Sequence, residues 1–178
     1  NGEWKFQYYN SIYDVTESFY EKGYDVSGFD QVTVPGVWQM DGYDTHQYTN
    51  IRYPFPFDPP YVPQDIPCGA YVHNFEYYRE KKASKAFLNF EGVDSCFYVW
   101  VNGAYAGYSQ VPHATSEFDV TDLLNEGENT LAVLVLKWCD GSYLEDQDKF
   151  RMSGIFRDVY LLKRPETTIR DYYITTDV

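Results

Sequence analysis

Apolar and polar residues alternate along this chain in short runs, and these runs favour strands over helices. In an extended backbone, Phe97, Val99 and Val101 would share one face, with Tyr98 and Trp100 on the other. Runs rich in β-branched and aromatic residues predict strands at residues 4–8, 31–34, 71–77, 86–90, 96–101, 130–137 and 159–162. The segment 130–137 is apolar almost throughout, which predicts a strand covered on both faces.

Turn signals separate the predicted strands, and helix is scarce. Asn102-Gly103 follows the run 96–101 and precedes the run 104–109, which predicts a hairpin with a type I′ turn. Residues 15–21 are expected to form about two helical turns, and residues 121–125 a single turn closed by Gly127. This pattern predicts an all-β fold, an antiparallel β-sandwich with little helix.

A proline-rich segment, residues 53–67, interrupts the strand pattern. Proline cannot donate to a sheet ladder, so this segment is no central strand. We expect an extended strap over the sandwich, with Tyr53, Phe55, Phe57 and Tyr61 turned inward.

The C-terminal residues differ from the predicted sandwich. Residues 164–168 have the composition of a linker, and residues 169–178 offer one more strand without a visible partner. We therefore expect residues 1–163 to form the sandwich, and residues 164–178 to be a linker with the first strand of a following domain.

Charge and composition narrow the classes of partner. The chain has 14 basic and 27 acidic residues and a net charge of −13, which disfavours nucleic acid and anionic membranes but suits a neutral ligand or a cation. No apolar run is long enough for a transmembrane helix. Aromatic residues make up 20% of the chain, which is typical of β-sheet and also of proteins that stack sugars. Cys68, Cys96 and Cys139 have no metal-binding or redox spacing, so buried free thiols in the cytoplasm are expected.

The acidic stretch WCDGSYLEDQDKFRMSGIFRDV, residues 138–159, is the main candidate for chemistry. It lacks the spacing of a calcium-binding EF-hand loop. Glu145 and Asp148 could lie close enough for a glycosidase pair, but nothing in the sequence places an apolar pocket around either carboxyl. The chain has no GxSxG elbow and no phosphate-binding glycine loop. What remains is a site for a hard cation or for sugar hydroxyls, both of which carboxylates bind.

Five segments occur in an order that resembles one family. These are NGEWKF, VPGVWQMDGYDTHQYTNIRYPF, FEGVDSCFYVWVNGAYAGYSQ, TSEFDVTDLLNEGENTLAVLVLKW and DGSYLEDQDKFRMSGIFRDVYLL. Together they are similar to the N-terminal sugar-binding domain of glycoside hydrolase family 2, and within it to the large bacterial β-galactosidases. The resemblance implies a galactose-binding-like jelly-roll β-sandwich, followed by an immunoglobulin-like domain that would begin within residues 164–178, and then by a TIM barrel.

The resemblance also implies a function. The parent would be a retaining β-galactosidase whose catalytic residues lie on the barrel, so none is expected in this chain. Asn50 matches a residue that hydrogen-bonds the galactosyl unit. Asp148 matches a ligand of a sodium ion that touches a sugar hydroxyl, with the other ligands on the barrel. A magnesium ion elsewhere in the parent and a homo-oligomeric parent are also expected.

Two alternatives remain open from the sequence. The abundance of aromatic residues also suits an autonomous carbohydrate-binding module. The unpartnered C-terminal strand suits a scaffold for assembly, since exposed strand edges pair with other chains. Calorimetry of this chain by itself with galactose or lactose is expected to show no detectable binding, because a few hydroxyl contacts do not offset the entropy lost on association.

Overall fold

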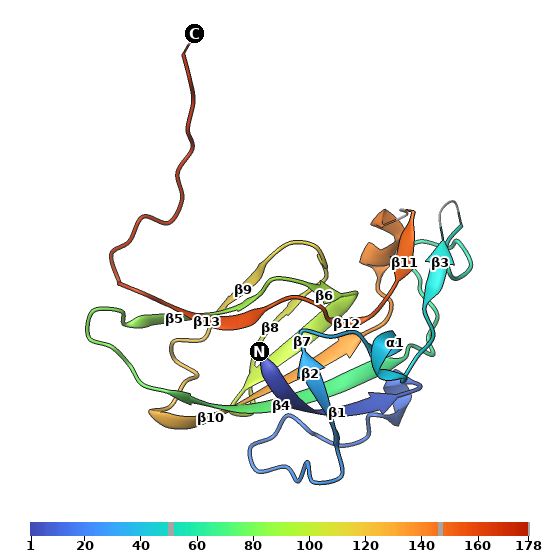
Figure 1. The fold of residues 1–178 in the computed structure, drawn as a ribbon, viewed down its shortest axis with the longest axis horizontal. Helices are drawn as coiled ribbons and strands as arrows, with labels where there is room; N and C mark the ends of the chain where they lie inside the picture. Colours follow the sequence, from blue (N-terminus) through green and yellow to red (C-terminus); the bar gives the residue numbers. More distant parts are fainter. Residues whose placement is uncertain (50–51, 146–147, 178) are drawn as a thin grey trace.

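The computed structural model describes residues 1–49, 52–145 and 148–177, and its largest element is a six-stranded antiparallel sheet (Figure 1). Its strand order is β2-β1-β4-β10-β7-β8. The strands are β1 (Gly2–Tyr9), β2 (Asp30–Val34), β4 (Cys68–Tyr77), β7 (Cys96–Val101), β8 (Ala104–Ser109) and β10 (Gly127–Leu136). The all-β sandwich expected from the sequence is confirmed, and every predicted strand of residues 1–163 lies within or overlaps an observed one.

A second, smaller layer packs against one face of this sheet. It is a three-stranded sheet in the order β13-β5-β9, with β5 at Lys85–Phe90, β9 at Ser116–Asp119 and β13 at Val159–Arg164. Two short strand pairs complete the described structure: β6 (Val93–Asp94) with β12 (Gly154–Ile155), and β3 (Gln47–Thr49) with β11 (Lys149–Arg151). The β3–β11 pair stands beyond one end of the sandwich (Figure 1).

The core lies between the two layers and follows from the alternation of the strands. Phe97, Val99 and Val101 of β7 are each at most 2% exposed, whereas Tyr98 and Trp100 face outward and are only partly covered. Burying an aromatic or branched side chain of this size contributes roughly 1.5–3 kcal/mol. The predicted two-faced pattern of β7 is therefore confirmed.

Strand β10 is buried on both faces, as its continuous apolar run predicts. Val133 and Val135 belong to the core between the layers, while Ala132 and Leu134 pack against Phe19 on the outer face of the large sheet. Phe19 lies in the segment 10–29, which runs beneath the large sheet in Figure 1. This segment gives the large sheet a second apolar cover.

The hairpin between β7 and β8 has the predicted turn. Asn102 has φ 54° and Gly103 has φ 83°, the two positive angles of a type I′ turn. The Asn102 side-chain amide also donates to the Leu123 carbonyl at 2.8 Å and to Asn129 Oδ1 at 2.7 Å. The turn therefore ties the β7–β8 hairpin to the loop before β10.

The helix predicted at residues 15–21 is wrong. A 3-10 helix occupies Ile12–Asp14 instead, capped by the Ser11 hydroxyl, and the following residues are irregular. The irregular path carries Phe19 down onto the sheet, where it is 3% exposed, so tertiary burial overrides local helix preference. Residues 121–123 form a hydrogen-bonded turn, with Leu123 N donating to the Val120 carbonyl, and no helix follows.

The other described helices lie near the two short strand pairs. They are α1 (Trp38–Asp41) and a 3-10 helix at Asp140–Leu144. Neither of them, nor the 3-10 helix Ile12–Asp14, is long enough to cross a membrane.

The segment 53–67 forms no strand, as its prolines predict, but it contains a turn in which Tyr61 N donates to the Asp58 carbonyl, and only half of its aromatic side chains turn inward. Phe55 is buried and Tyr53 half-buried, whereas Phe57 and Tyr61 are 67% and 72% exposed. Residues 165–177 form no strand in this structure, so the strand expected at 169–178 is not present within the described part of this segment. Their assignment to a following domain stays a prediction.

The core analysis predicts that Phe97→Ala lowers the free energy of unfolding by about 3–5 kcal/mol, because the cavity collapses only partly. Urea unfolding followed by circular dichroism measures this change. Tyr78, which is 57% exposed, provides the matched control, and Tyr78→Ala should cost less than about 1 kcal/mol. Equal losses in both variants would contradict the assignment of Phe97 to the core.

Candidate functional site

The pairing of β3 with β11 joins the two segments that the sequence singled out. Thr49 lies opposite Lys149, and Tyr48 opposite Phe150. These strands are about a hundred residues apart in the chain. In the sequence, Asn50 directly follows β3, and Asp148 directly precedes β11. Asn50 itself lies outside the described residues, so its predicted contact with sugar stays a prediction. Asp148 is described, and its side chain lies at an exposed position.

Asp148 is held by a neighbouring aromatic side chain. The Tyr48 hydroxyl donates a hydrogen bond to Asp148 Oδ1, and this bond raises the pKa of Tyr48 above its ordinary value. The Tyr48 and Phe150 rings lie 5.4 Å apart, and His46 meets Phe150 edge-on at 5.2 Å. The carboxylate therefore stands beside a small exposed aromatic surface, a combination that suits a sugar ring.

Arg151, a residue of β11, anchors the β3–β11 pair. Its side chain is 5% exposed, and Nε donates to Thr49 Oγ1 at 3.3 Å. The guanidinium also donates to the Glu145 backbone carbonyl and lies 3.9 Å from the Glu145 carboxylate. One buried cation thus connects β3, β11 and the end of the 3-10 helix Asp140–Leu144, on either side of Asp148.

Two further carboxylates complete an ionic cluster under the site. Lys149 Nζ lies 3.8 Å from Asp94 Oδ2 and 3.9 Å from Glu145 Oε2. Burial raises the pKa of Asp94 to about 7 and also raises that of Glu145, although Lys149 and Arg151 oppose both shifts. Glu145 is therefore engaged in this cluster, and the sequence-based possibility of an open Glu145–Asp148 acid–base pair finds no support in its surroundings.

A second buried ion pair fixes the segment that leads into β3. Lys137 Nζ, at the end of β10, lies 2.5 Å from Asp44 Oδ2, and both side chains are at most 12% exposed. The Gln39 amide donates to Asp44 Oδ2 at 3.1 Å, and its oxygen accepts from Ser153 N at 2.9 Å. This chain of contacts links α1 and the residues before β3 and β12 to the residue that follows β10.

The proline-rich strap supports the site from the other side. The Tyr143 hydroxyl donates to the Tyr61 carbonyl at 2.5 Å and accepts from Asp58 N at 3.2 Å. The Tyr53 hydroxyl donates to the Tyr143 carbonyl at 2.9 Å, and Phe55 packs edge-on against the Tyr143 ring. The strap therefore holds the 3-10 helix Asp140–Leu144 in place.

This arrangement limits the chemistry that the described residues offer. Residues 1–49, 52–145 and 148–177 contain no group of three or more His, Cys, Asp or Glu side chains placed to hold a metal. Asp148 presents carboxylate oxygens that can accept hydrogen bonds from sugar hydroxyls or act as one ligand of a hard cation. Among the described residues of this site, Asp148 is thus one exposed carboxylate with this capacity.

Sequence reasoning missed the groups that hold Asp148 in place. Tyr48 lies two residues before Asn50, and its role depends on the β3–β11 register, which a three-residue strand does not reveal in sequence. The buried ion pair of Lys137 with Asp44 spans more than 90 residues and leaves no local pattern.

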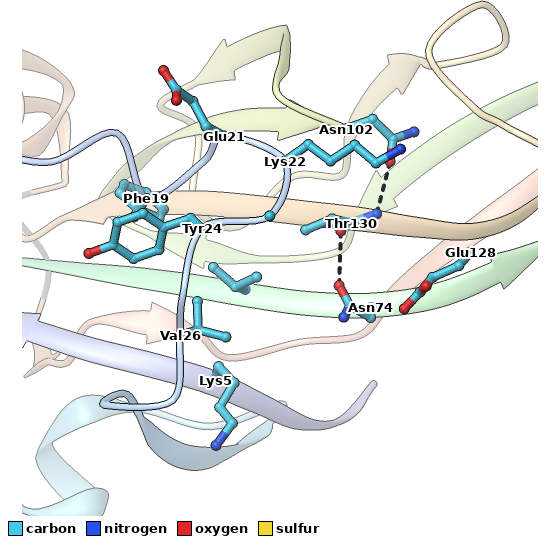
Figure 2. A pocket seen from close by; sticks show the side chains of 12 residues that line it. Lys5, Phe19, Glu21, Lys22, Tyr24, Val26, Asn74, Asn102, Glu128 and Thr130 are labelled. Carbon is cyan, nitrogen blue, oxygen red and sulfur yellow. Dashed lines mark hydrogen bonds between the residues drawn. The ribbon is translucent and has the colours of Figure 1, made fainter.

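A separate cavity of about 460 Å³ lies on the outer face of the large sheet (Figure 2). Lys5, Lys22 and Glu128 contribute charges of both signs to its lining. The Thr130 hydroxyl donates to Asn74 Oδ1 at 3.0 Å, so these two polar groups satisfy one another. Asp148 is not part of this cavity, which therefore does not belong to the candidate site.

Comparisons with known proteins agree with this fold. The family model described as "Glycosyl hydrolases family 2, sugar binding domain" matches residues 1–165. A beta-galactosidase of Actinobacillus pleuropneumoniae is 54% identical over 174 residues, and one of Staphylococcus xylosus is 50% identical over 178 residues. These alignments cover 98% and 100% of this chain but only 17% of each relative, so the chain spans about a sixth of their length.

Solved structures show the same fold. The covalently modified Bacteroides uniformis beta-glucuronidase 2 has a TM-score of 0.69 at 22% identity, over 93% of this chain and 17% of that one. A Bacteroides vulgatus beta-glycosidase has a TM-score of 0.62 at 26% identity, over 91% of this chain and 19% of that one.

The buried pair of Lys137 with Asp44 predicts that Asp44→Ala lowers the free energy of unfolding by about 3–5 kcal/mol, since it leaves a buried ammonium without its carboxylate. Thermal and urea unfolding measure the loss. The exposed pair of Lys163 with Glu80 is the control, and Glu80→Ala should cost at most about 1 kcal/mol. A loss of similar size in both variants would show that burial does not govern the Asp44 contact.

The raised pKa of Asp94 predicts a dependence of stability on pH. The carboxyl is protonated up to about pH 7 when folded. When unfolded it titrates near its ordinary value of about 4. Between these values the folded chain binds more protons, so the contribution of Asp94 to stability falls as pH rises. Asp94→Asn should flatten this fall, measured as urea midpoints from acid to neutral pH. Parallel curves for the wild type and the variant would contradict the assignment.

Proposed function

Because this chain belongs to the family 2 glycosyl hydrolase sugar-binding domain family, we propose that it is the non-catalytic N-terminal domain of a β-galactosidase. The observation that supports this proposal is the pairing of β3, which ends at Thr49, with β11, which begins directly after Asp148, at one end of the sandwich. In this proposal the domain contributes oxygen atoms to the rim of an active site. The proton-transfer and nucleophilic groups would lie outside residues 1–178.

Asp148 would have two roles at this rim. Its carboxylate would accept a hydrogen bond from a sugar hydroxyl and would also be one ligand of a sodium ion. Sodium, when bound, would supply a positive charge that orients a second sugar hydroxyl. Tyr48, whose hydroxyl donates to Oδ1, would hold the carboxylate in the orientation that both tasks need. Asn50, on the segment that continues from β3, would hydrogen-bond the galactosyl unit.

The ionic cluster next to the β3–β11 pair supports the assignment of sugar binding to Asp148 and not to Arg151 or Lys149. Arg151 and Lys149 are engaged with Glu145 and Asp94 and are mostly buried, so they face the protein and not the sugar. Asp148 lies beside this cluster at an exposed position. Asp148 directly precedes β11, and a binding residue next to a packed strand keeps its geometry better than one in the middle of a free loop. The magnesium ion, the oligomeric parent and the cytoplasmic location expected from the sequence stay predictions.

The proposal predicts that Asp148→Asn, in the β-galactosidase that contains this domain, lowers kcat/KM for a galactoside about 10–100-fold. The loss follows because the amide is a weaker ligand for a cation and a different hydrogen-bond partner. Activity should also stop responding to sodium when sodium is titrated against potassium at constant ionic strength.

Asp122, an exposed acid in the loop before β10, is the matched control. Asp122→Asn should leave both kcat/KM and the sodium response unchanged. A full sodium response in Asp148→Asn, with normal thermal unfolding, would overturn the role assigned to Asp148.

A further inference from the structure

The outer face of the large sheet carries a second cavity that the proposed active-site rim does not use. It measures about 350 Å³ and lies between the segment 10–29 and the strands β7 and β10. Its lining combines apolar and polar groups, among them Thr16, Glu17, Ser18, Tyr20, Trp100 and Leu134. An apolar wall with a few convergent polar groups is the usual composition of a small-ligand site.

The apolar wall is an ordered aromatic stack. The Tyr20 and Trp100 rings lie 4.7 Å apart and are 10° from parallel. Phe19, which is 3% exposed and packs on Ala132 and Leu134, meets the Trp100 ring edge-on at 6.0 Å. The stack is thus held by the second apolar cluster of the fold, which pre-organises it for a ligand.

The polar rim comes from the segment just before Tyr20. Thr16 and Glu17 are exposed and Ser18 is half-buried, and all three line the cavity. Glu17 Oε2 accepts a hydrogen bond from the Tyr24 hydroxyl at 2.5 Å, which restricts the carboxylate. Thr16, Glu17 and Ser18 therefore line the same cavity as Tyr20 and Trp100, and the Glu17 carboxylate is directed toward Tyr24 at the margin of this cavity.

Aromatic surface continues outside the cavity. The Tyr98 ring lies 6.1 Å from Trp100, and Tyr108 lies 4.8 Å from Tyr98. Tyr98 and Tyr108 are 36% and 38% exposed. This strip of rings follows β7 and β8 along the outer face of the sheet.

We propose that this cavity binds one neutral hexopyranose unit, at a site separate from Asp148. A pyranose has a face of C–H groups that packs on aromatic rings and an edge of hydroxyls that hydrogen-bonds to carboxylate and hydroxyl oxygens. The volume of 350 Å³ lies near the lower end of the roughly 300–1,000 Å³ of small-molecule sites, which suits a single sugar ring. Glu17 and the net charge of −13 disfavour an anionic sugar.

The location separates this site from the rim. The segment 10–29 lies on the side of the large sheet away from the three-stranded layer, whereas β3 and β11 stand beyond one end of the sandwich (Figure 1). The inference therefore does not depend on the role proposed for Asp148.

Nuclear magnetic resonance titration of the chain with methyl β-D-galactopyranoside tests the proposal. The amides of residues 16–20 and 98–100 should shift and saturate with a dissociation constant in the millimolar range. Tyr20→Leu should raise that constant about five- to tenfold, through the lost ring contact. Tyr13 lies on the same segment, is 69% exposed and does not line the cavity, so Tyr13→Leu should bind like the wild type.

Asp148→Asn should leave these chemical-shift changes unchanged. A failure of the role proposed for Asp148 can therefore be distinguished from a failure of sugar binding in this cavity. If Tyr20→Leu does not fold by circular dichroism, Glu17→Gln replaces it, with the same expected direction. The proposal is overturned if the shifts are absent, are confined to residues 47–49 and 148–151, or weaken equally in Tyr13→Leu. Tighter binding of methyl β-D-glucuronide than of the galactoside would overturn the assignment to a neutral sugar.

Discussion

Burial of β10 on both faces is the constraint on which the rest of the structure depends. The strand pairs with β4 along its whole length and with β7 over its second half. Its side chains alternate between the core and the cover supplied by Phe19 and its neighbours. Hydrophobic burial scales with the apolar area removed from water, so a central strand covered on both faces contributes more to stability than one that is half solvated.

The same strand connects the core to the candidate site. Lys137, directly after β10, forms the buried ion pair with Asp44 that holds the segment leading into β3. Cys139 then caps the 3-10 helix Asp140–Leu144 that leads into the segment of Asp148. The ion pair therefore anchors to the sandwich the segment that leads into β3, the strand that pairs with β11 directly after Asp148. A rigid base of this kind suits a domain that supplies oxygen ligands to a shared site.

On the outer face of the large sheet, the irregular segment 10–29 both covers β10 and borders two cavities. Residues 10–29 cover the apolar side of β10 and, in doing so, leave cavities at their margins. One cavity has lysine and glutamate side chains in its lining, whereas the other is walled by Tyr20 and Trp100. The difference follows from what the strands beneath present, since β7 carries aromatic residues outward where β4 carries Asn74.

The amino-acid sequence by itself determined the strands of the large sheet, the strands β5 and β13, the β7–β8 hairpin and the two-faced burial of β10, but it did not reveal β3, β6, β9, β11 and β12. These features depend on alternation, β-branched residues and the Asn102-Gly103 pair, which act over a few residues. It also indicated Asp148, through a motif. Only the tertiary structure decided that residues 15–21 are not helical, that Phe57 and Tyr61 face outward, and that Tyr48 and Arg151 support the site. Each of these depends on contacts between distant residues, whose free energy exceeds local preference and leaves no pattern in neighbouring positions.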